Sequence, residues 1–204
     1  MDSTGFRSKG YGFLCVVLFM GGCISIPNSP TPRFYALSVA GKDQLGKAIK
    51  APFSALVGIG PVKLPEYLDR PQIVTEDKWN MLQFAQFDRW GGSLDLGLAR
   101  LVREDIAILL PGAKLNLYPW NPSIAVKYQV IIEVVELDSQ LDGDMHFAVQ
   151  WTVIGLQDPK TVIIKRSDFR TAINPHNYSG LAQTLSNDCS SLSVEIAQEL
   201  ASLK

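Results

Sequence analysis

The fold is decided by the stretch Val126-Lys127-Tyr128-Gln129-Val130-Ile131-Ile132-Glu133-Val134. Apolar or aromatic side chains occupy every second position, and side chains with this period lie on one face of a β-strand. Apolar residues at Ile131, Val135 and Leu137 indicate partial burial of the opposite face too. The stretch therefore predicts a long strand with apolar side chains on both faces.

The chain that follows repeats this alternation twice. A polar turn over residues 138–144 leads to a return strand in which alternate residues from Met145 to Val153 are apolar, and a second turn leads to a third strand over residues 161–170. Three long antiparallel strands in sequence form a meander. After Asn174-Pro175, apolar residues spaced by three and four predict a final helix. Its apolar stripe consists of Leu181, Leu185, Cys189, Leu192, Ile196 and Leu200.

The chain that precedes the stretch supplies a second helix and shorter strands. Ser93 can cap a helix whose apolar residues run from Leu94 to Leu109, and Pro111-Gly112 ends it. Strand-like segments occupy residues 33–39, 55–63, 72–75, 80–87 and 115–117. The third and fourth of these would pair as a hairpin across the polar turn Glu76-Asp77-Lys78. These elements predict an α/β two-layer sandwich, in which a mixed, largely antiparallel sheet has two helices packed on one face. Apolar side chains exposed on the other face would mark an interface.

Residues 1–22 have the layout of a secretory signal. Arg7 and Lys9 precede an apolar run from Tyr11 to Met20, and two small residues follow the run. The run is about ten residues long, whereas a membrane-spanning helix needs about 20. We therefore do not expect a retained transmembrane anchor.

The hexapeptide Leu18-Phe19-Met20-Gly21-Gly22-Cys23 resembles the bacterial lipobox. The resemblance implies that Cys23 becomes the first mature residue and carries acyl chains on its sulfur and its new amino group, which gives stable membrane anchoring. Lipoproteins retained at the inner membrane usually carry Asp after this cysteine. Because Ile24 stands there, the resemblance implies an outer membrane, with the protein facing the periplasm. The alternative is cleavage elsewhere, or an ordinary cleaved signal that leaves Cys23 as a thiol.

The segment after Cys23 reads as a tether. It holds three prolines within six residues, and proline fixes φ and disfavours a helix, so an extended linker is expected. The expected organisation is a lipoprotein signal peptide at residues 1–22, the lipidated Cys with its Pro-rich linker at residues 23–33, and a single periplasmic domain at residues 34–204.

The charge balance and the number of cysteines limit which binding partners and which disulfides are expected. The chain has 19 basic and 20 acidic residues and a formal net charge of −1, which gives no electrostatic footprint for nucleic acid. With the signal removed and Cys23 acylated, Cys189 is the remaining thiol, so no intramolecular disulfide is expected. Its position on the apolar stripe of the final helix predicts a buried core residue.

The sequence holds no set of residues that indicates catalysis. His146 and His176 lie far apart in sequence and form no metal-ligand set of recognisable spacing. Asp142, Asp144 and His146 alternate at a hairpin and could meet a metal, but a polar turn is the stronger interpretation. No G-x-S-x-G nucleophile elbow is present. We therefore predict that the protein is not an enzyme and has no cofactor and no metal site.

A specific resemblance lies between residues 57 and 74. The chain reads Val57-Gly58-Ile59-Gly60-Pro61-Val62 and then Leu64-Pro65-Glu66-Tyr67-Leu68-Asp69-Arg70-Pro71-Gln72-Ile73-Val74. This order resembles the signature of the PqiC family of ABC-transport auxiliary lipoproteins. The resemblance extends over almost the whole mature chain, at Phe34-Tyr35-Ala36-Leu37, Arg89-Trp90, Pro119-Trp120 and Trp151. One departure is Gly91-Gly92-Ser93, where relatives more often carry a non-glycine link into the following helix.

The resemblance implies a non-enzymatic function in the cell envelope. Such a lipoprotein is an outer-membrane-anchored partner of an MCE-domain protein, in an assembly that carries phospholipid or related apolar molecules between membranes. One tethered domain, or a homo-oligomeric ring of them, would receive the end of the transport channel. Two other functions stay open. One is activation of a peptidoglycan synthase or help in assembling a lipopolysaccharide pore, and the other is an enzyme that uses Asp142, Asp144 or His146 on envelope lipid or glycan.

The segment between Pro65 and Pro71 is the candidate contact site. The two prolines bracket a segment too short for a helix of its own, which forces a rigid excursion between strands. In one interpretation Tyr67 and Leu68 pack on the core and Asp69 with Arg70 holds the turn. In the other, the loop contacts a partner or a neighbouring subunit. The candidate partner-binding residues are Pro65, Glu66, Tyr67, Leu68, Asp69 and Arg70.

Overall fold

The computed structural model describes residues 30–39, 45–50, 53–158 and 160–203, and residues 31–204 form one compact unit. The lipobox and residues 23–29 of the expected linker, Cys23 included, lie outside the described residues. Within the described part, no helix combines the length and the apolar character needed to cross a membrane.

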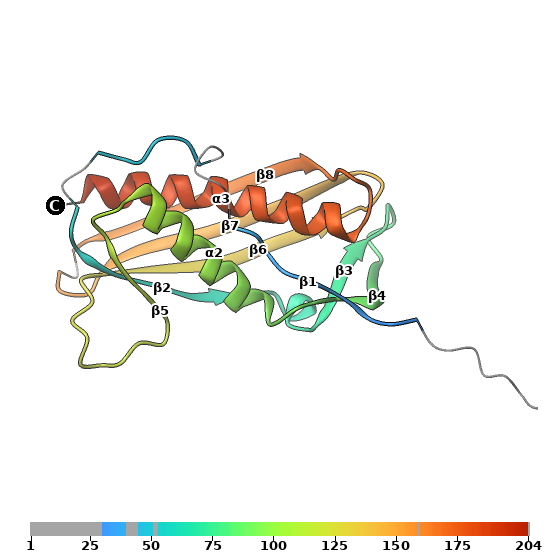
Figure 1. Cartoon of the computed structure of the whole chain (residues 1–204), viewed down its shortest axis with the longest axis horizontal. Coiled ribbons are helices and arrows are strands. Elements are labelled where there is room, and N and C mark those ends of the chain that lie inside the picture. The colour runs from blue at the N-terminus through green and yellow to red at the C-terminus, as the bar shows by residue number, and fades with distance from the viewer. Residues whose placement is uncertain (1–29, 40–44, 51–52, 159, 204) are drawn as a thin grey trace, which may run out of the picture. The chain divides into compact units, whose positions relative to one another are not determined.

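Five of the described strands form the larger sheet (Figure 1). In spatial order they are β5 (Lys114–Leu117), β2 (Leu56–Lys63), β6 (Tyr128–Ser139), β7 (Asp144–Gly155) and β8 (Val162–Ala172). β6, β7 and β8 are the predicted antiparallel meander, while β2 runs parallel to both β5 and β6. The stretch quoted first enters β6, the central strand of this sheet, as its two-sided apolar pattern predicts.

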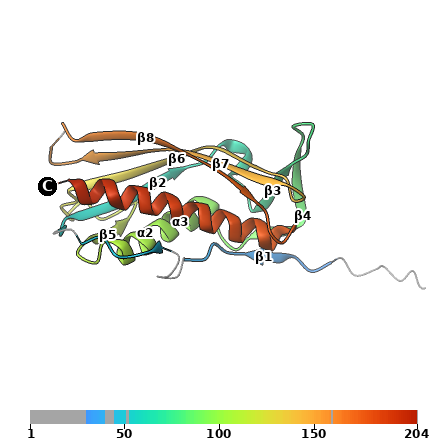
Figure 2. The same cartoon turned by 90° about the horizontal axis from the view of Figure 1, so that it is seen from above.

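Two helices, α2 (Leu94–Leu109) and α3 (Tyr178–Ser202), cover one face of the larger sheet (Figure 2). α2 packs on β2 and β5, α3 packs on β7 and β8, and the helices contact each other. Beneath them lie fully buried aromatic side chains, and the indole N–H of Trp151 donates to the hydroxyl of Ser167 at 3.0 Å. The predicted fold class is therefore confirmed.

The remaining described strands form a smaller sheet, which the sequence did not separate from the larger one. Its order is β1 (Arg33–Tyr35), β4 (Leu82–Trp90) and β3 (Gln72–Glu76). β3 and β4 are the predicted hairpin, whereas β1 is parallel to β4 and shorter than the predicted strand over residues 33–39. The chain leaves β2 through the short 3₁₀-helix η1 (Glu66–Leu68), flanked by Pro65 and Pro71, and this excursion starts the second sheet.

The ends of α2, the buried stripe of α3 and the burial of Cys189 agree with the sequence predictions. Ser93 is the N-cap of α2, although its side chain makes no capping hydrogen bond, and α2 ends before Pro111. The apolar stripe predicted for the final helix is buried in α3. Cys189 is 1% exposed and is confirmed as a core residue, and burial raises the pKa of its thiol.

Candidate interaction surfaces

The loop between Pro65 and Pro71 is held down by its middle residues. Leu68 is buried, and the hydroxyl of Tyr67 accepts a hydrogen bond from the backbone N–H of Leu137 at 3.3 Å and lies 3.5 Å from Oδ1 of Asp138. Burial raises the pKa of this hydroxyl. The side chains that the loop presents to solvent are those of Glu66 and Asp69. Tyr67 and Leu68 therefore pack as in the first interpretation, and the exposed residues are available for a partner.

Arg70 points from this loop toward the smaller sheet. Its guanidinium carbon lies 4.3 Å from the centroid of the Phe84 ring, a cation–π contact, and no ion pair joins it to Asp69 among the described residues. Its Nε atom is buried without a hydrogen-bond partner, as is Nε of Arg89. Arg70 stacks on Phe84 and Arg89 is in register with Phe34, so both groups lie beside a surface of exposed apolar side chains.

That surface is formed by Phe34, Trp79, Met81, Leu82 and Phe84, and we call it the hairpin patch. Their exposed fractions are 66%, 77%, 58%, 37% and 47%, which is unusual for large apolar side chains. Sequence reasoning missed them because it treated the β3–β4 connection as a polar turn. The available signal was the pair Trp79 and Met81, which stand on either side of Asn80.

The turn itself holds the tip of the patch outward. A carboxylate oxygen of Asp77 accepts the backbone N–H groups of Trp79 and Met81, at 2.8 and 3.0 Å. Asn80, between them, has φ of 60°, a left-handed conformation that asparagine tolerates. Lys78 places its ammonium 5.8 Å from the centroid of the Trp79 ring. The local sequence thus fixes a turn whose apolar side chains face solvent.

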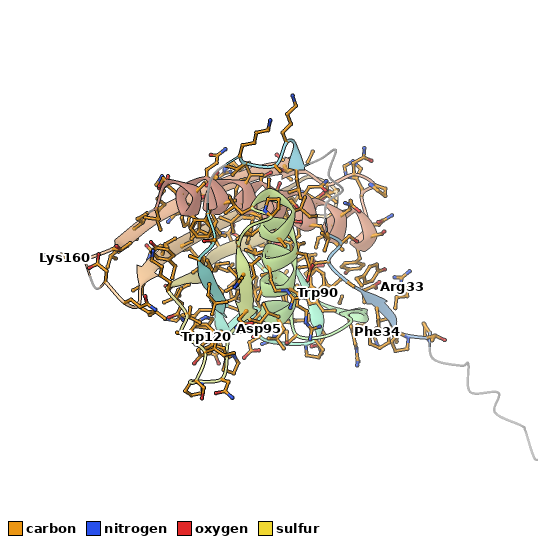
Figure 3. All side chains as sticks on the ribbon, turned by 60° about the vertical axis from the view of Figure 1, so that its left-hand side comes forward. Arg33, Phe34, Trp90, Asp95, Trp120 and Lys160 are labelled. Carbon is orange, nitrogen blue, oxygen red and sulfur yellow. The ribbon has the colours of Figure 1, made fainter. Side chains whose placement is uncertain are left out.

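A buried carboxylate fastens β1 to this sheet. Arg33 donates from Nε and from an Nη atom to the two oxygens of Asp88, at 2.8 and 2.7 Å, and the hydroxyl of Tyr35 donates to the same group at 2.7 Å. Burial alone would raise the pKa of the Asp88 carboxyl, but the hydrogen bonds from Arg33 and Tyr35 outweigh it and hold the pKa below its usual value. Figure 3 shows Arg33 and Phe34 together on β1, where the chain enters the domain.

Two cavities flank the junction between β4 and α2. One, of about 430 Å³, is lined by Phe34, Arg70, Pro71 and Trp90 among others, and the second, of about 270 Å³, lies on the other side of β1. The backbone N–H of Gly91 donates to the carbonyl of Tyr35 at 2.7 Å, and a Cβ on Gly91 would lie 3.3 Å from that oxygen. The glycine link therefore lets β1 pass close to this junction.

On the open face of the larger sheet, His146 lies among carboxylates. Its Nδ1 is 2.8 Å from Glu136, and its Nε2 is 3.1 Å from Asp168, which also accepts from Arg166. The described group compact enough for a metal is Glu136, Asp138 and His146, with ligand atoms within 4.8 Å of one another. The sequence had grouped His146 with Asp142 and Asp144 instead, and neither belongs to this cluster.

The register of β6 and β7 explains the difference. Asp138 lies directly opposite His146, and an irregularity after Val134 brings Glu136 onto the same side. Burial, followed by a hydrogen bond to Glu136, raises the pKa of Asp138 to about 7, while hydrogen bonds from Arg166 and then His146 lower the pKa of Asp168 to about 2. Both ring nitrogens of His146 therefore have carboxylate partners from adjacent strands.

The rest of the open face is apolar at one end. Val135, Val162 and Ile164 are 43%, 51% and 63% exposed. Trp120 lies flat on β2, where a Cβ on Gly58 would approach its ring to 2.3 Å. Only glycine lets the indole cover the strand there.

Comparison with known proteins agrees with this architecture. The profile of a family described as "ABC-type transport auxiliary lipoprotein component" matches residues 35–197. No curated protein gave a match.

Two solved structures share the fold at low sequence identity. An uncharacterized protein superposes with a TM-score of 0.68 at 17% identity, with 83% of this chain and 99% of that chain covered. A protein from Xanthomonas campestris gives a TM-score of 0.65 at 14% identity, with coverages of 81% and 92%. A PelC dodecamer from Paraburkholderia phytofirmans gives 0.43 at 12% identity, with coverages of 76% and 91%.

Proposed function

Because this chain belongs to the family of ABC-type transport auxiliary lipoprotein components, we propose that it is a PqiC-type member, an outer-membrane-anchored periplasmic subunit of an MCE-type intermembrane lipid-transport system. The observation that carries the proposal is the Pro65–Pro71 signature inside the matched region, folded as a partly exposed loop around η1. The family is one of transport auxiliary components and not of enzymes.

The anchor in this proposal is Cys23, acylated after removal of residues 1–22. The tether, residues 23–33, enters the domain at β1, which the Arg33–Asp88 ion pair fastens to the smaller sheet. The single periplasmic domain over residues 34–204 would then stand on the periplasmic side of the outer membrane.

The contact with the MCE-domain protein is assigned to the exposed part of the loop. Glu66 and Asp69 extend into solvent above a base fixed by Tyr67 and Leu68, so the loop would bind without first being ordered. The exposed apolar residues of the open sheet face, Val162 and Ile164, offer a second surface, suited to the partner or to a neighbouring copy in a ring. The role is docking, with no chemical step and no cofactor.

The experiment is affinity purification of the full-length protein from crosslinked membranes. A Glu66→Lys/Asp69→Lys variant reverses the charge of the loop, and Asp142→Lys makes the same kind of change at an exposed turn elsewhere. We expect an MCE-domain protein to be recovered with the wild type and with Asp142→Lys, and to be lost with the loop variant. A further control combines Cys23→Ala with an ordinary cleavable signal, and its release into the soluble periplasmic fraction would support the lipid anchor.

Other outcomes decide against the proposal. Recovery of a peptidoglycan synthase or of a lipopolysaccharide pore would assign the protein to one of those envelope systems and would leave the anchor intact. Recovery of the MCE-domain protein with the loop variant at the wild-type level would move the contact away from Glu66 and Asp69.

A further inference from the structure

The proposed contacts leave the hairpin patch unused. Phe34 and Arg70 line the same cavity, and Arg70 stacks on Phe84, so the patch is continuous from β1 to β4. Leu82 lies on the same face of β4 as Phe84, and Met81 and Trp79 are exposed beyond it at the tip of the hairpin. A surface of five large exposed apolar side chains is typical of a binding site.

The chemistry of the patch suits a lipid–water interface. Trp79 and Phe84 are aromatic, and each has a cation over its ring, Lys78 and Arg70 respectively. Side chains of this kind place their apolar part among acyl chains and their charged or polar part at the level of lipid phosphates. Arg89, paired in register with Phe34, adds a guanidinium whose Nε has no protein partner. Cations beside aromatic groups are what anionic headgroups attract.

The position of the hairpin patch indicates which surface it contacts. The described chain enters the domain at β1, and both views place this entry at the same end as the β3–β4 hairpin (Figures 1 and 2). Arg33 lies ten positions after Cys23, and an extended chain of that length reaches at most about 35 Å. An acylated Cys23 would therefore keep this end of the domain within that distance of the bilayer, near enough for the patch to reach the headgroups.

We propose that the hairpin patch rests in the headgroup region of the membrane that holds the acyl chains of Cys23. The inference rests on the proposed anchoring. Two attachments, the acylated cysteine and the patch, restrict how the domain rotates on its tether. The orientation of the partner-binding loop and of the open sheet face is then set relative to the membrane, and a docking subunit gains from such preorganisation.

The test uses the acylated full-length protein in vesicles of phosphatidylethanolamine and phosphatidylglycerol, with or without bromine on the acyl chains. Bromine quenches the fluorescence of indoles that reach it. Trp79 is 77% exposed, whereas Trp90 and Trp151 are buried and Trp120 lies on β2. We expect the brominated chains to quench part of the wild-type emission, to quench Trp120→Phe equally, and to leave the emission of Trp79→Phe unchanged.

The mass of the purified chain separates this inference from the proposed function. An acylated chain whose Trp79 emission is unaffected by bromine overturns the membrane contact and leaves the anchor standing. A chain without acyl groups overturns the anchoring, and the inference with it. Trp79 emission that shifts with protein concentration and not with lipid would assign the patch to a contact between copies of the chain, which also overturns the inference.

Discussion

The two sheets have similar alternating sequence patterns, but the aromatic side chains on one face are buried in the larger sheet and exposed in the smaller one. In the larger sheet, Phe147 and Trp151 are 0% exposed because α2 and α3 cover that face. In the smaller sheet, Phe34 and Phe84 are 66% and 47% exposed, because neither helix lies over the face on which they stand. The comparison teaches that alternation identifies a strand, while the cover supplied by distant elements decides whether its apolar side chains stabilise the fold or remain free to bind.

The largest expected effect comes from truncating the core of the larger sheet. Trp151→Ala removes a fully buried ring and the hydrogen bond of its indole to Ser167, so we expect the free energy of unfolding to fall by about 3–5 kcal/mol. Urea unfolding followed by circular dichroism measures it. Ile164→Ala, on the open face of the same sheet, is the control and should change stability by about 0.5 kcal/mol or less. Equal losses in the two variants would contradict the assignment of the covered face as the core.

The attachment of β1 comes next. Asp88→Ala removes the acceptor of three hydrogen bonds from Arg33 and Tyr35, and we expect a loss of about 2–3 kcal/mol. Trypsin, which cuts after Arg33, should release the tether several-fold faster from this variant, because β1 then opens more often. Unchanged cleavage would mean that the Gly91 N–H bond to Tyr35, and not Asp88, secures the strand.

Asp188 should give a smaller, pH-dependent effect in the covered layer. It is 5% exposed, one of its oxygens has no hydrogen-bond partner, and burial raises the pKa of its carboxyl to about 6 although Thr171 donates to it at 2.8 Å. The folded protein therefore keeps a proton that the unfolded chain releases near pH 4. The stabilising contribution of this group is full below about pH 4 and is lost as the pH rises to about 6.

Asp188→Asn removes this titration and keeps the acceptor. We expect it to raise the free energy of unfolding at pH 7.5 by about 1–2 kcal/mol and to leave it nearly unchanged at pH 4. Urea midpoints at the two pH values, compared with the wild type, measure the difference. A variant that follows the wild-type pH dependence would show that folding does not raise the pKa of Asp188.

The elements predicted correctly from local periodicity are those in which one face of the strand or helix is buried along its length. The alternation from Tyr128 to Val134 and the stripe through Cys189 each repeat within a single element, so they could be read directly. The separate three-stranded sheet could not, because its strands pair only after the Pro65–Pro71 excursion redirects the chain. That redirection depends on contacts made by Tyr67 and Leu68 far along the sequence.

The candidate sites show the same limit. The sequence grouped His146 with acidic neighbours in its own turn, whereas the carboxylates it contacts, Glu136 and Asp168, come from the adjacent strands. Those contacts depend on strand register and on the irregularity after Val134, and neither is encoded in a local pattern. The exposure of Trp79 likewise depends on which face of the hairpin remains uncovered.

The smallest expected effect on stability comes from the hairpin patch. Trp79→Ser/Met81→Ser shortens two side chains that are 77% and 58% exposed, while their backbone N–H groups still donate to Asp77, so the free energy of unfolding should change by about 0.5 kcal/mol or less. Ile73→Ala, at a fully buried position of the same hairpin, should cost about 2–5 kcal/mol. Urea unfolding measures the free energy of unfolding of both variants and so distinguishes the exposed from the buried side of the hairpin. If the surface pair cost as much as Ile73→Ala, the patch would be part of the core, and a selective binding role for its side chains would lose its physical basis.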